Sequence, residues 1–297
     1  MLLEDVAKSA TTRVALMSLS GAGKSTLAAK LSTHYNLHWI TLENDVDILL
    51  KLPKEDWHRV KVYNLPDSAT FPVAADSLMK LFSNGKAKFC HAHGVDDCKV
   101  CRKESPTAFS ELNFRDLDPK ADIVVIDSGS QLGHSILAHA TKDHPVDYKP
   151  ERDDWGALRK WTEFFSSQWQ AARVNLVVLF HAVEVEMEDG RTKMVPSFGS
   201  KDMSSKIAKA FSHVVYLDIM NGIHKAYSAS TYSNNVLTKS RTDFEIERLQ
   251  QASLLPIFLG EIPSTMLLKE EPLKGDEKIT KKDVSSSLEK LKARLTK

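Results

Sequence analysis

Residues 14–26, VALMSLSGAGKST, carry the clearest chemistry in the chain. An apolar run typical of a buried strand leads into a glycine-bearing turn, and a helix is expected to continue over residues 27–31. The backbone amides of such a turn surround phosphate oxygens, and the helix dipole favours their negative charge. Lys24 can reach the β- and γ-phosphates of a nucleotide, and Ser25 can ligate Mg²⁺. The segment therefore predicts a binding site for a nucleoside triphosphate.

One position departs from the pattern G-x-x-x-x-G-K-[ST]. Ser18 stands where the pattern has its first glycine, which makes the opening of the turn less permissive. An ordinary glycine-rich turn between a strand and a helix is the alternative interpretation. We expect ATP to be held by seven consecutive residues: Ser20, Gly21, Ala22, Gly23, Lys24, Ser25 and Thr26.

Two carboxylates follow predicted buried strands. ATP hydrolysis needs a carboxylate to hold Mg²⁺ and a group that positions the attacking water. Asp127 ends the apolar run of residues 123–126 and suits the first role, with an ordinary helix N-cap as the alternative. Glu43 follows the strand expected over residues 38–42 and suits the second role, with Asp45 as its competitor and a solvated acidic turn as the alternative. Parallel strands present their carboxyl ends at one edge of a sheet, so we expect both groups beside the phosphate turn.

The cysteines call for a separate explanation, because all of them fall within residues 90–101. Cys90, His93, Cys98 and Cys101 offer three thiolates and an imidazole in a loop short enough to close around Zn²⁺. His91 is an alternative fourth ligand, and free or redox-active cysteines are the alternative to a metal site. We expect a zinc loop inserted at residues 86–119, either as a structural staple or as a contact for DNA or protein.

The elements that hold these residues alternate along the chain. Helical spacing occurs over residues 72–85 and 153–173, and buried strands are expected at 174–181 and 213–219. Asp189-Gly190 predicts a β-hairpin, and further strands are expected at 225–230 and 235–241. The pattern favours an α/β fold with a mostly parallel central sheet. We expect an aromatic stripe of the second helix to be core: Trp155, Leu158, Trp161, Phe164, Phe165 and Trp169.

Composition limits the remaining possibilities. The 297 residues, 42% of them hydrophobic, suit one principal domain over residues 1–267. Forty basic and thirty-nine acidic residues provide no broad cationic field, so any polyanion site must be local. Residues 268–297 predict a charged, flexible tail in which Asp283 can cap a short terminal helix. No apolar run has membrane-span length and no signal peptide is evident, so we expect a cytoplasmic protein without a membrane partner.

Over about residues 12–260 the chain resembles the RecA-like P-loop ATPases, and within them a compact phage-encoded group associated with single-strand annealing and recombination. SLSGAGKST resembles their phosphate loop, TLEND the strand ending in a catalytic glutamate at Glu43, and VVIDSGSQL the magnesium-linked strand at Asp127. LVVLFHAVEV places His181 where relatives carry a polar residue that senses the γ-phosphate. VLTKSRTDF resembles the late strand from which basic residues, here Lys239 and Arg241, reach the neighbouring subunit's ATP site.

The resemblance implies a recombinase or annealing ATPase that binds single-stranded DNA, forms homo-oligomeric rings or filaments and hydrolyses ATP at a subunit interface. Its location would be the host cytoplasm for a phage-encoded protein, and the tail could meet a single-strand-binding protein. DNA would lie along residues 139–154 and 184–205, where Arg191, Lys193 and Lys201 offer phosphate contacts. Both segments also carry acids, so a solvated hairpin is the alternative for the second.

Two rival functions use the same nucleotide site. A nucleotide-gated signalling or assembly ATPase would act on a protein partner through the zinc loop and tail. A nucleotide kinase would transfer the phosphoryl group to a small acceptor, but the sequence offers no arginine-rich lid to close over one.

Overall fold

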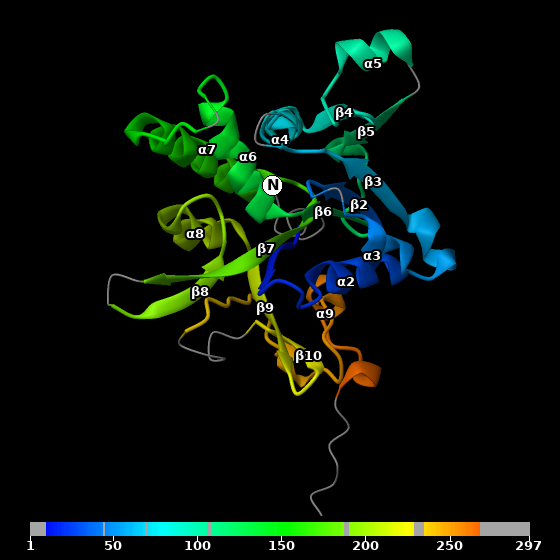
Figure 1. Ribbon diagram of the computed structural model, residues 1–297. Helices are drawn as coiled ribbons and strands as arrows, with labels where there is room; N and C mark the ends of the chain where they lie inside the picture. The colour runs from blue at the N-terminus through cyan, green and yellow to red at the C-terminus, as the bar shows by residue number, and fades with distance from the viewer. Residues whose placement is uncertain are drawn as a thin grey trace, which may run out of the picture.

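The computed structural model describes residues 10–43, 45–68, 71–105, 108–145, 147–186, 190–228 and 235–267. Its main sheet has the order β10-β9-β1-β7-β6-β2-β3, with β8 paired to β7 (Figure 1). Adjacent strands along β9-β1-β7-β6-β2-β3 are all parallel, which confirms the prediction of a mostly parallel sheet. These strands are β1 (Arg13–Ser18), β2 (Asn36–Thr41), β3 (Val60–Asn64), β6 (Asp122–Asp127), β7 (Asn175–Glu186) and β9 (His213–Met220).

Two antiparallel strands extend this sheet. The predicted hairpin is present, because β8 (Thr192–Pro196) pairs with the second half of β7. Residues 187–189 of its turn lie outside the described residues. At the edge of the sheet β10 (Ile223–Tyr227) folds back on β9.

Helices cover both faces of the sheet (Figure 1). Alternate residues of a strand point to opposite faces, so Ala15 and Met17 of β1 join one core while Val14 and Leu16 join the other. The first core includes side chains of α4 (Val73–Asn84), α6 (Gly129–Thr141), α7 (Arg152–Ala171) and α8 (Lys201–Ile207). The second includes side chains of α2 (Lys24–Ala29), α3 (Asp47–Leu50) and α9 (Leu255–Leu259).

The insertion forms a small unit of its own. Strands β4 (Lys86–Cys90) and β5 (Phe109–Asn113) pair antiparallel, and α5 (Lys99–Glu104) lies between them in the chain. Short 3₁₀ segments complete the described chain: η1 (Lys30–Thr33), η2 (Lys54–Arg59), η3 (Phe114–Asp116), η4 (Ala208–Ala210), η5 (Ile246–Arg248) and η6 (Ser264–Met266).

Gly129 explains how closely α6 approaches the sheet. A Cβ atom at this position would lie 2.4 Å from the Phe180 ring and 2.7 Å from a methyl group of Val178. Only glycine therefore lets the first turn of α6 lie directly against β7. This contact fixes the segment that follows Asp127.

Some details differ from the sequence predictions. Trp155, which the sequence predicted to be core, is 41% exposed. The buried residues of α7 share one face of the helix: Asp154, Leu158, Thr162, Phe165 and Trp169. Trp155 lies about 100° around the helix from Asp154. The helix of the phosphate turn begins at Lys24 rather than at residue 27.

The strand expected at residues 235–241 is instead two isolated bridges, from Val236 to Met194 and from Lys239 to Val214. Strand β9 pairs with β1 on one side and with β10 on the other, which leaves only its first residues for this segment. The predicted tail, with Asp283, lies outside the described residues. In the described ranges, no helix combines the length and apolarity needed to cross a bilayer.

Candidate functional site

The predicted nucleotide-binding residues meet at the carboxyl edge of the main sheet. Ser18, the last residue of β1, is in register with His181 of β7, and Thr41 at the end of β2 is in register with Asp127. Strand β7 lies between β1 and β6, so His181 falls between the phosphate turn and Asp127. A cavity of about 280 Å³ opens at this edge, lined by Ser20, Gly21, Gly23, Lys24, Ser25, Thr26, Glu43, Asp45, Ile48, Asp127, Ser128 and His181.

The turn between β1 and α2 has the backbone geometry of a phosphate cradle. Gly21 and Gly23 have φ angles of 77° and 88°, in the left-handed region that favours glycine, and Gly23 caps α2. The Nζ of buried Lys24 donates to Ser18 Oγ at 3.1 Å, and lies 3.4 Å from the Leu19 carbonyl. Ser18, which breaks the sequence pattern, thus holds the lysine in place. Burial lowers the pKa of Lys24, opposed by the charges of Asp127 and Glu43.

Asp127 is a buried carboxylate next to the turn, 8% exposed. Burial raises its pKa to about 6, and the charge of Glu43 adds to this increase, while a hydrogen bond from the Ser25 side chain and the charge of Lys24 oppose it. A buried carboxylate, a second carboxylate and a hydroxyl form a hard oxygen donor set of the kind that Mg²⁺ prefers. Ser25 and Asp127 therefore fit the predicted magnesium site.

Glu43 is oriented by a residue that the sequence analysis missed. The hydroxyl of Ser128, which is buried, donates a hydrogen bond to Glu43 Oε1. The Ser128 hydroxyl also accepts a hydrogen bond from the backbone amide of Gln131 and so caps α6. The sequence signal that could have identified Ser128 is its position, as a polar residue directly after the aspartate that ends a buried strand. The contact holds the Glu43 carboxylate at the cavity, and Asp45 lines the same cavity.

His181 connects the cavity with the β7–β8 hairpin. Its amide donates to Ser130 Oγ at 2.9 Å, and its carbonyl accepts from the Ser197 amide at 2.8 Å. Ser130 Oγ in turn donates to the Ser197 carbonyl at 2.9 Å. Burial and the charge of Lys24 lower the pKa of His181, which favours the neutral imidazole, while the charge of Glu43 opposes this effect.

Lys239 and Arg241 lie away from the chain's own phosphate turn. Val214 at the start of β9 bridges to Lys239, and the Lys239 Nζ donates to the Phe211 carbonyl at 2.7 Å. Val14, at the amino end of β1, is in register with the first residue of β9. Lys239 and Arg241 therefore lie beside the amino end of β1. Because β1 extends five residue steps from there to its carboxyl end, at about 3.3 Å per step, both cations lie on the order of 17 Å from the carboxyl edge.

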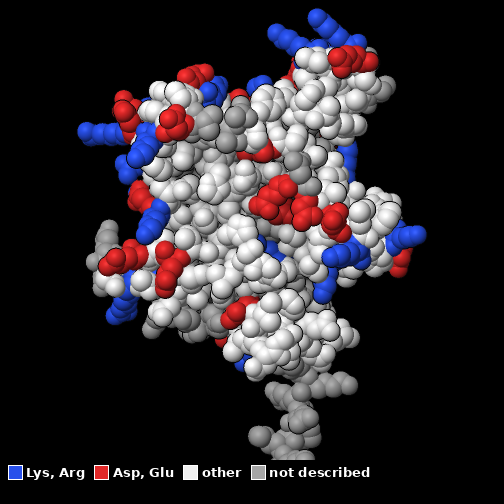
Figure 2. Space-filling view, viewed as in Figure 1, with Lys and Arg blue, Asp and Glu red and all other residues white. Residues whose placement is uncertain are grey.

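Two of the three residues predicted to contact DNA lie in regular elements. Lys193 lies in β8, Arg191 precedes it, and Lys201 begins α8 instead of lying in a loop. On the face seen in Figure 2, acidic side chains gather near the centre, in the region of α3, while Lys and Arg lie mostly around the rim. This face carries no broad cationic surface.

The predicted zinc ligands come together. The ligand atoms of Cys90, His93, Cys98 and Cys101 all lie within 4.8 Å of one another. The His93 Nδ1 is 3.9, 3.8 and 3.2 Å from the three sulfur atoms in chain order. Ligands about 2.0–2.3 Å from a tetrahedral Zn²⁺ lie about 3.5–3.8 Å apart, so the donor set and spacing fit zinc. His91 instead has its Nε2 2.9 Å from Ser110 Oγ, which leaves His93 as the fourth member.

Gly94 attaches this loop to the main domain. A Cβ at Gly94 would lie 2.6 Å from the Leu65 Cα and 2.8 Å from the Asn64 carbonyl oxygen. The Gly94 carbonyl also accepts a hydrogen bond from Ser77 of α4 at 3.0 Å. The loop that carries the three cysteines and His93 is therefore packed tightly against the end of β3.

Comparison with known proteins agrees with this geometry. The model of the AAA domain family matches residues 10–242, which span the phosphate turn, Glu43, Asp127 and His181. Among curated proteins, none matches the chain. The family match covers most of the sequence and includes every strand of the main sheet. The chain therefore belongs to the AAA domain family, whose members are P-loop ATPases.

Proposed function

We propose that the protein hydrolyses MgATP at the carboxyl edge of its sheet and couples hydrolysis to single-stranded DNA. The observation that supports catalysis is the assembly of Lys24, Ser25, Glu43, Asp127 and His181 around one cavity. The chain brings these groups from four separate segments. A merely structural glycine turn would not require them to converge.

In this proposal each side chain has a defined task. The amides of residues 20–26 and the Lys24 ammonium bind the phosphate oxygens and offset the charge that develops on them. Ser25 and Asp127 hold Mg²⁺, which supplies electrostatic stabilisation of the phosphates when bound. Glu43, oriented by Ser128, accepts a hydrogen bond from the attacking water and aligns it with the γ-phosphate. The His181 imidazole, which lines the same cavity, forms a hydrogen bond with the γ-phosphate or with the attacking water.

Coupling to DNA is supported by the position of His181 in β7. The residues that precede it lie in the central sheet, and the residues that follow it pair with β8. A displacement of His181 on binding or loss of the γ-phosphate would be passed to the hairpin through Ser197. Lys193 and Arg191 at the outer part of that hairpin offer contacts to the phosphates of a single strand.

Assembly is supported by the distance of Arg241 from the chain's own site. A cation about 17 Å from the phosphate turn can act on a γ-phosphate only in a neighbouring copy. We therefore include in the proposal a homo-oligomer in which Lys239 and Arg241 complete the ATP site of the next subunit. The proposed recombination or annealing role rests on this assembly together with the DNA contacts.

Zinc binding is a separate part of the proposal. Three buried thiols around one imidazole fit a closed structural site, and Gly94 ties that site to β3 and α4. Protein purified without added zinc should contain close to one equivalent by metal analysis, and Cys98→Ser should retain well under half of it. Full-length wild-type protein with well under one equivalent of any transition metal would contradict the site.

The ATPase rate with and without single-stranded DNA tests the proposed function. We expect MgATP hydrolysis that rises several-fold when a homopolymeric oligonucleotide is added, and an increase that weakens with salt. Arg191→Ala together with Lys193→Ala should lower the stimulation without changing the basal rate. A rate indifferent to DNA would favour an ATPase that acts on a protein partner, and phosphoryl transfer to an added nucleoside would favour a kinase.

A further inference from the structure

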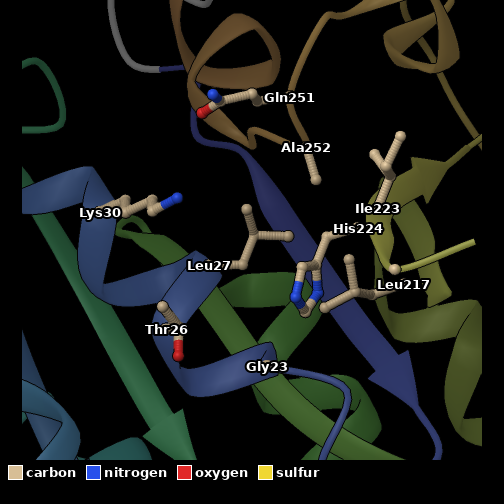
Figure 3. Close-up of a pocket in the computed structure, with 10 residues that line it drawn as sticks. Gly23, Thr26, Leu27, Lys30, Leu217, Ile223, His224, Gln251 and Ala252 are labelled. Atoms are coloured by element: carbon tan, nitrogen blue, oxygen red, sulfur yellow. The ribbon is translucent and has the colours of Figure 1, made fainter. Parts of the chain in front are cut away.

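The phosphate turn borders two cavities, and the carboxylates line only one of them. The cavity in Figure 3 lies between α2 and the β9–β10 hairpin, and none of the described residues that line it is acidic. The other cavity shares Gly23 and Thr26 with it and is lined by Glu43, Asp45 and Asp127. Groups that orient these carboxylates can therefore control hydrolysis.

The orientation of Glu43 depends on the first turn of α6. The Ser128 hydroxyl donates to the Glu43 carboxylate and accepts from the Gln131 amide at 3.2 Å. Because one hydroxyl serves both groups, its position follows that of the turn formed by residues 128–131. Gly129 lets this turn pack directly on β7. A second group holds the same turn to α4.

Asp67 is this second group. It follows β3, whose last residue, Asn64, is in register with Thr41 at the carboxyl edge of the sheet. Its Oδ2 accepts from the Gln131 Nε2 at 3.2 Å, and its Oδ1 accepts from Ser135 Oγ at 2.8 Å. The Oδ1 also accepts from the amide of Ala74, near the start of α4, at 3.0 Å. One carboxylate therefore joins α4 to the first two turns of α6.

The surroundings of Asp67 are polar but not cationic. Burial raises its pKa, and hydrogen bonds from two amides of α4 and from the side chains of Ser135 and Gln131 oppose this increase. Among the described residues, no Lys or Arg forms an ion pair with Asp67. The position of the carboxylate is therefore set by the two helices that donate to it.

The cysteine loop, residues 90–101, packs on the segment that leads to Asp67. A Cβ at Gly94 would lie 2.6 Å from the Leu65 Cα and 2.9 Å from the Pro66 Cδ. Leu65 is buried, and its amide donates to the carbonyl of Thr41 at 2.9 Å, two residues before Glu43. The loop thus contacts a segment that connects with Glu43 by two routes, through the end of β2 and through Asp67 and α6.

We propose that Asp67 is a positioning residue for Glu43, and that the cysteine loop holds Asp67 in place by packing Gly94 on residues 64–66. The inference rests on the proposed function, because that function assigns the alignment of the attacking water to Glu43. Asp67 is outside the described lining of the nucleotide cavity and acts through Gln131 and Ser128. Its loss should therefore slow hydrolysis and leave ATP affinity unchanged.

Steady-state hydrolysis and MgATP titration of the full chain test the positioning role. Gln131→Met removes the donor to Asp67 and keeps the length of the side chain, while Asp67→Ala removes the acceptor. Each should lower kcat about fivefold and keep KM within about twofold of the wild-type value. In the Glu43→Gln background neither should lower the rate further, which a merely structural role would not explain.

A matched control uses an aspartate on a different part of the chain. Asp118 precedes the amino end of β6, is exposed and accepts from the Lys120 amide at 2.9 Å. Asp118→Asn should leave both kcat and ATP affinity unchanged.

Two glycine variants test the link to the cysteine loop. Gly94 and Gly85 have φ angles of 64° and 71°, so alanine introduces similar backbone strain at both. A Cβ at Gly85 meets none of the described atoms within 4 Å, whereas a Cβ at Gly94 must displace residues 64–66. Gly94→Ala should lower kcat about fivefold, and Gly85→Ala should keep the wild-type kcat.

The outcomes separate this inference from the proposed function. Unchanged kcat in folded Gln131→Met or folded Asp67→Ala would overturn the positioning role, and so would an equal loss in the Glu43→Gln background. Equal kcat values for folded Gly94→Ala and Gly85→Ala would remove the cysteine loop from the account. A wild-type protein that does not hydrolyse MgATP would instead remove the proposed function itself.

Discussion

The two edges of the main sheet differ sharply in charge. At the carboxyl edge, Glu43, Asp45 and Asp127 line a cavity that contains one lysine. At the amino edge, Arg13, Lys239 and Arg241 lie close enough for each to influence the ionisation of a neighbour. The buried His213 lies among them, and its pKa falls to about 4 because of burial and the charges of Arg241 and Lys239.

The two groups of described side chains are complementary in charge. The lining of the carboxyl-edge cavity includes three carboxylates and one lysine. The amino edge holds cations, and within the described residues none of these three forms an ion pair with an acidic side chain. The Arg13 Nε is even buried without a hydrogen-bond partner in the described part of the chain. Contact between the carboxyl edge of one copy and the amino edge of the next would bring opposite charges together.

Removing the amino-edge cation should produce the largest effect. Arg241→Ala should lower the ATPase rate about 10³-fold, in the range of arginines supplied to a neighbouring site, while ATP binding is retained. The measurement is steady-state hydrolysis at protein concentrations where the wild type assembles, together with ATP titration.

A mixing experiment sharpens this prediction. Lys24→Ala and Arg241→Ala are each expected to be inactive alone, but a mixed oligomer contains interfaces with an intact turn and an intact arginine. Activity should therefore reappear on mixing. Full activity of Arg241→Ala by itself would rule out the role of the amino edge.

At the carboxyl edge, Glu43→Gln should lower the hydrolysis rate about 10²-fold, because an amide cannot accept a proton from the attacking water. ATP binding should remain near the wild-type value. Asp45→Asn is the matched control on the same segment and should change the rate less than threefold. The reverse ranking of the two variants would assign the water-positioning role to Asp45.

Loss of the Ser128 hydroxyl should have a smaller effect at the same edge. Ser128→Ala removes the hydrogen bond that orients Glu43, and we expect about a tenfold fall in kcat with little change in KM. In the Glu43→Gln background the same substitution should add almost nothing. Additive losses would show that Ser128 acts independently of Glu43.

The smallest effect concerns stability at the amino edge. The folded protein resists protonation of His213 down to pH about 4, whereas the unfolded chain protonates near its ordinary value of 6.5. The contribution of neutral His213 to the free energy of unfolding is therefore complete above pH 6.5 and is lost as the pH falls toward 4. With solvent screening, we expect the free energy of unfolding to be lower at pH 5 by on the order of 1 kcal/mol. Urea unfolding of wild type and His213→Gln at pH 7 and 5 measures it, and an equal pH dependence of the two proteins would contradict the prediction.

The sequence predicted the parts of the site that depend on local pattern. The glycine turn, the aspartate after residues 123–126 and the Cys/His spacing are each contained in a short segment. The register between strands then brings Ser18, His181 and Asp127 to one edge, as parallel pairing requires.

Features that arise from packing between distant segments were not predictable in this way. The Ser128–Glu43 contact joins residues 85 positions apart, and the His224–Ala22 contact spans 202 positions. The exposure of Trp155 and the loss of a continuous strand at residues 235–241 depend on which neighbours the sheet offers. The role of Ser18 as a partner of Lys24 also appears only when the turn is folded.

The central claim is that the turn after β1 binds MgATP through Lys24. Isothermal titration of MgATP into wild type, Lys24→Ala and the exposed-lysine control Lys209→Ala tests it most directly. The account predicts binding by wild type and Lys209→Ala, with an affinity at least tenfold lower in Lys24→Ala. Equal MgATP affinity in wild type and Lys24→Ala would contradict it.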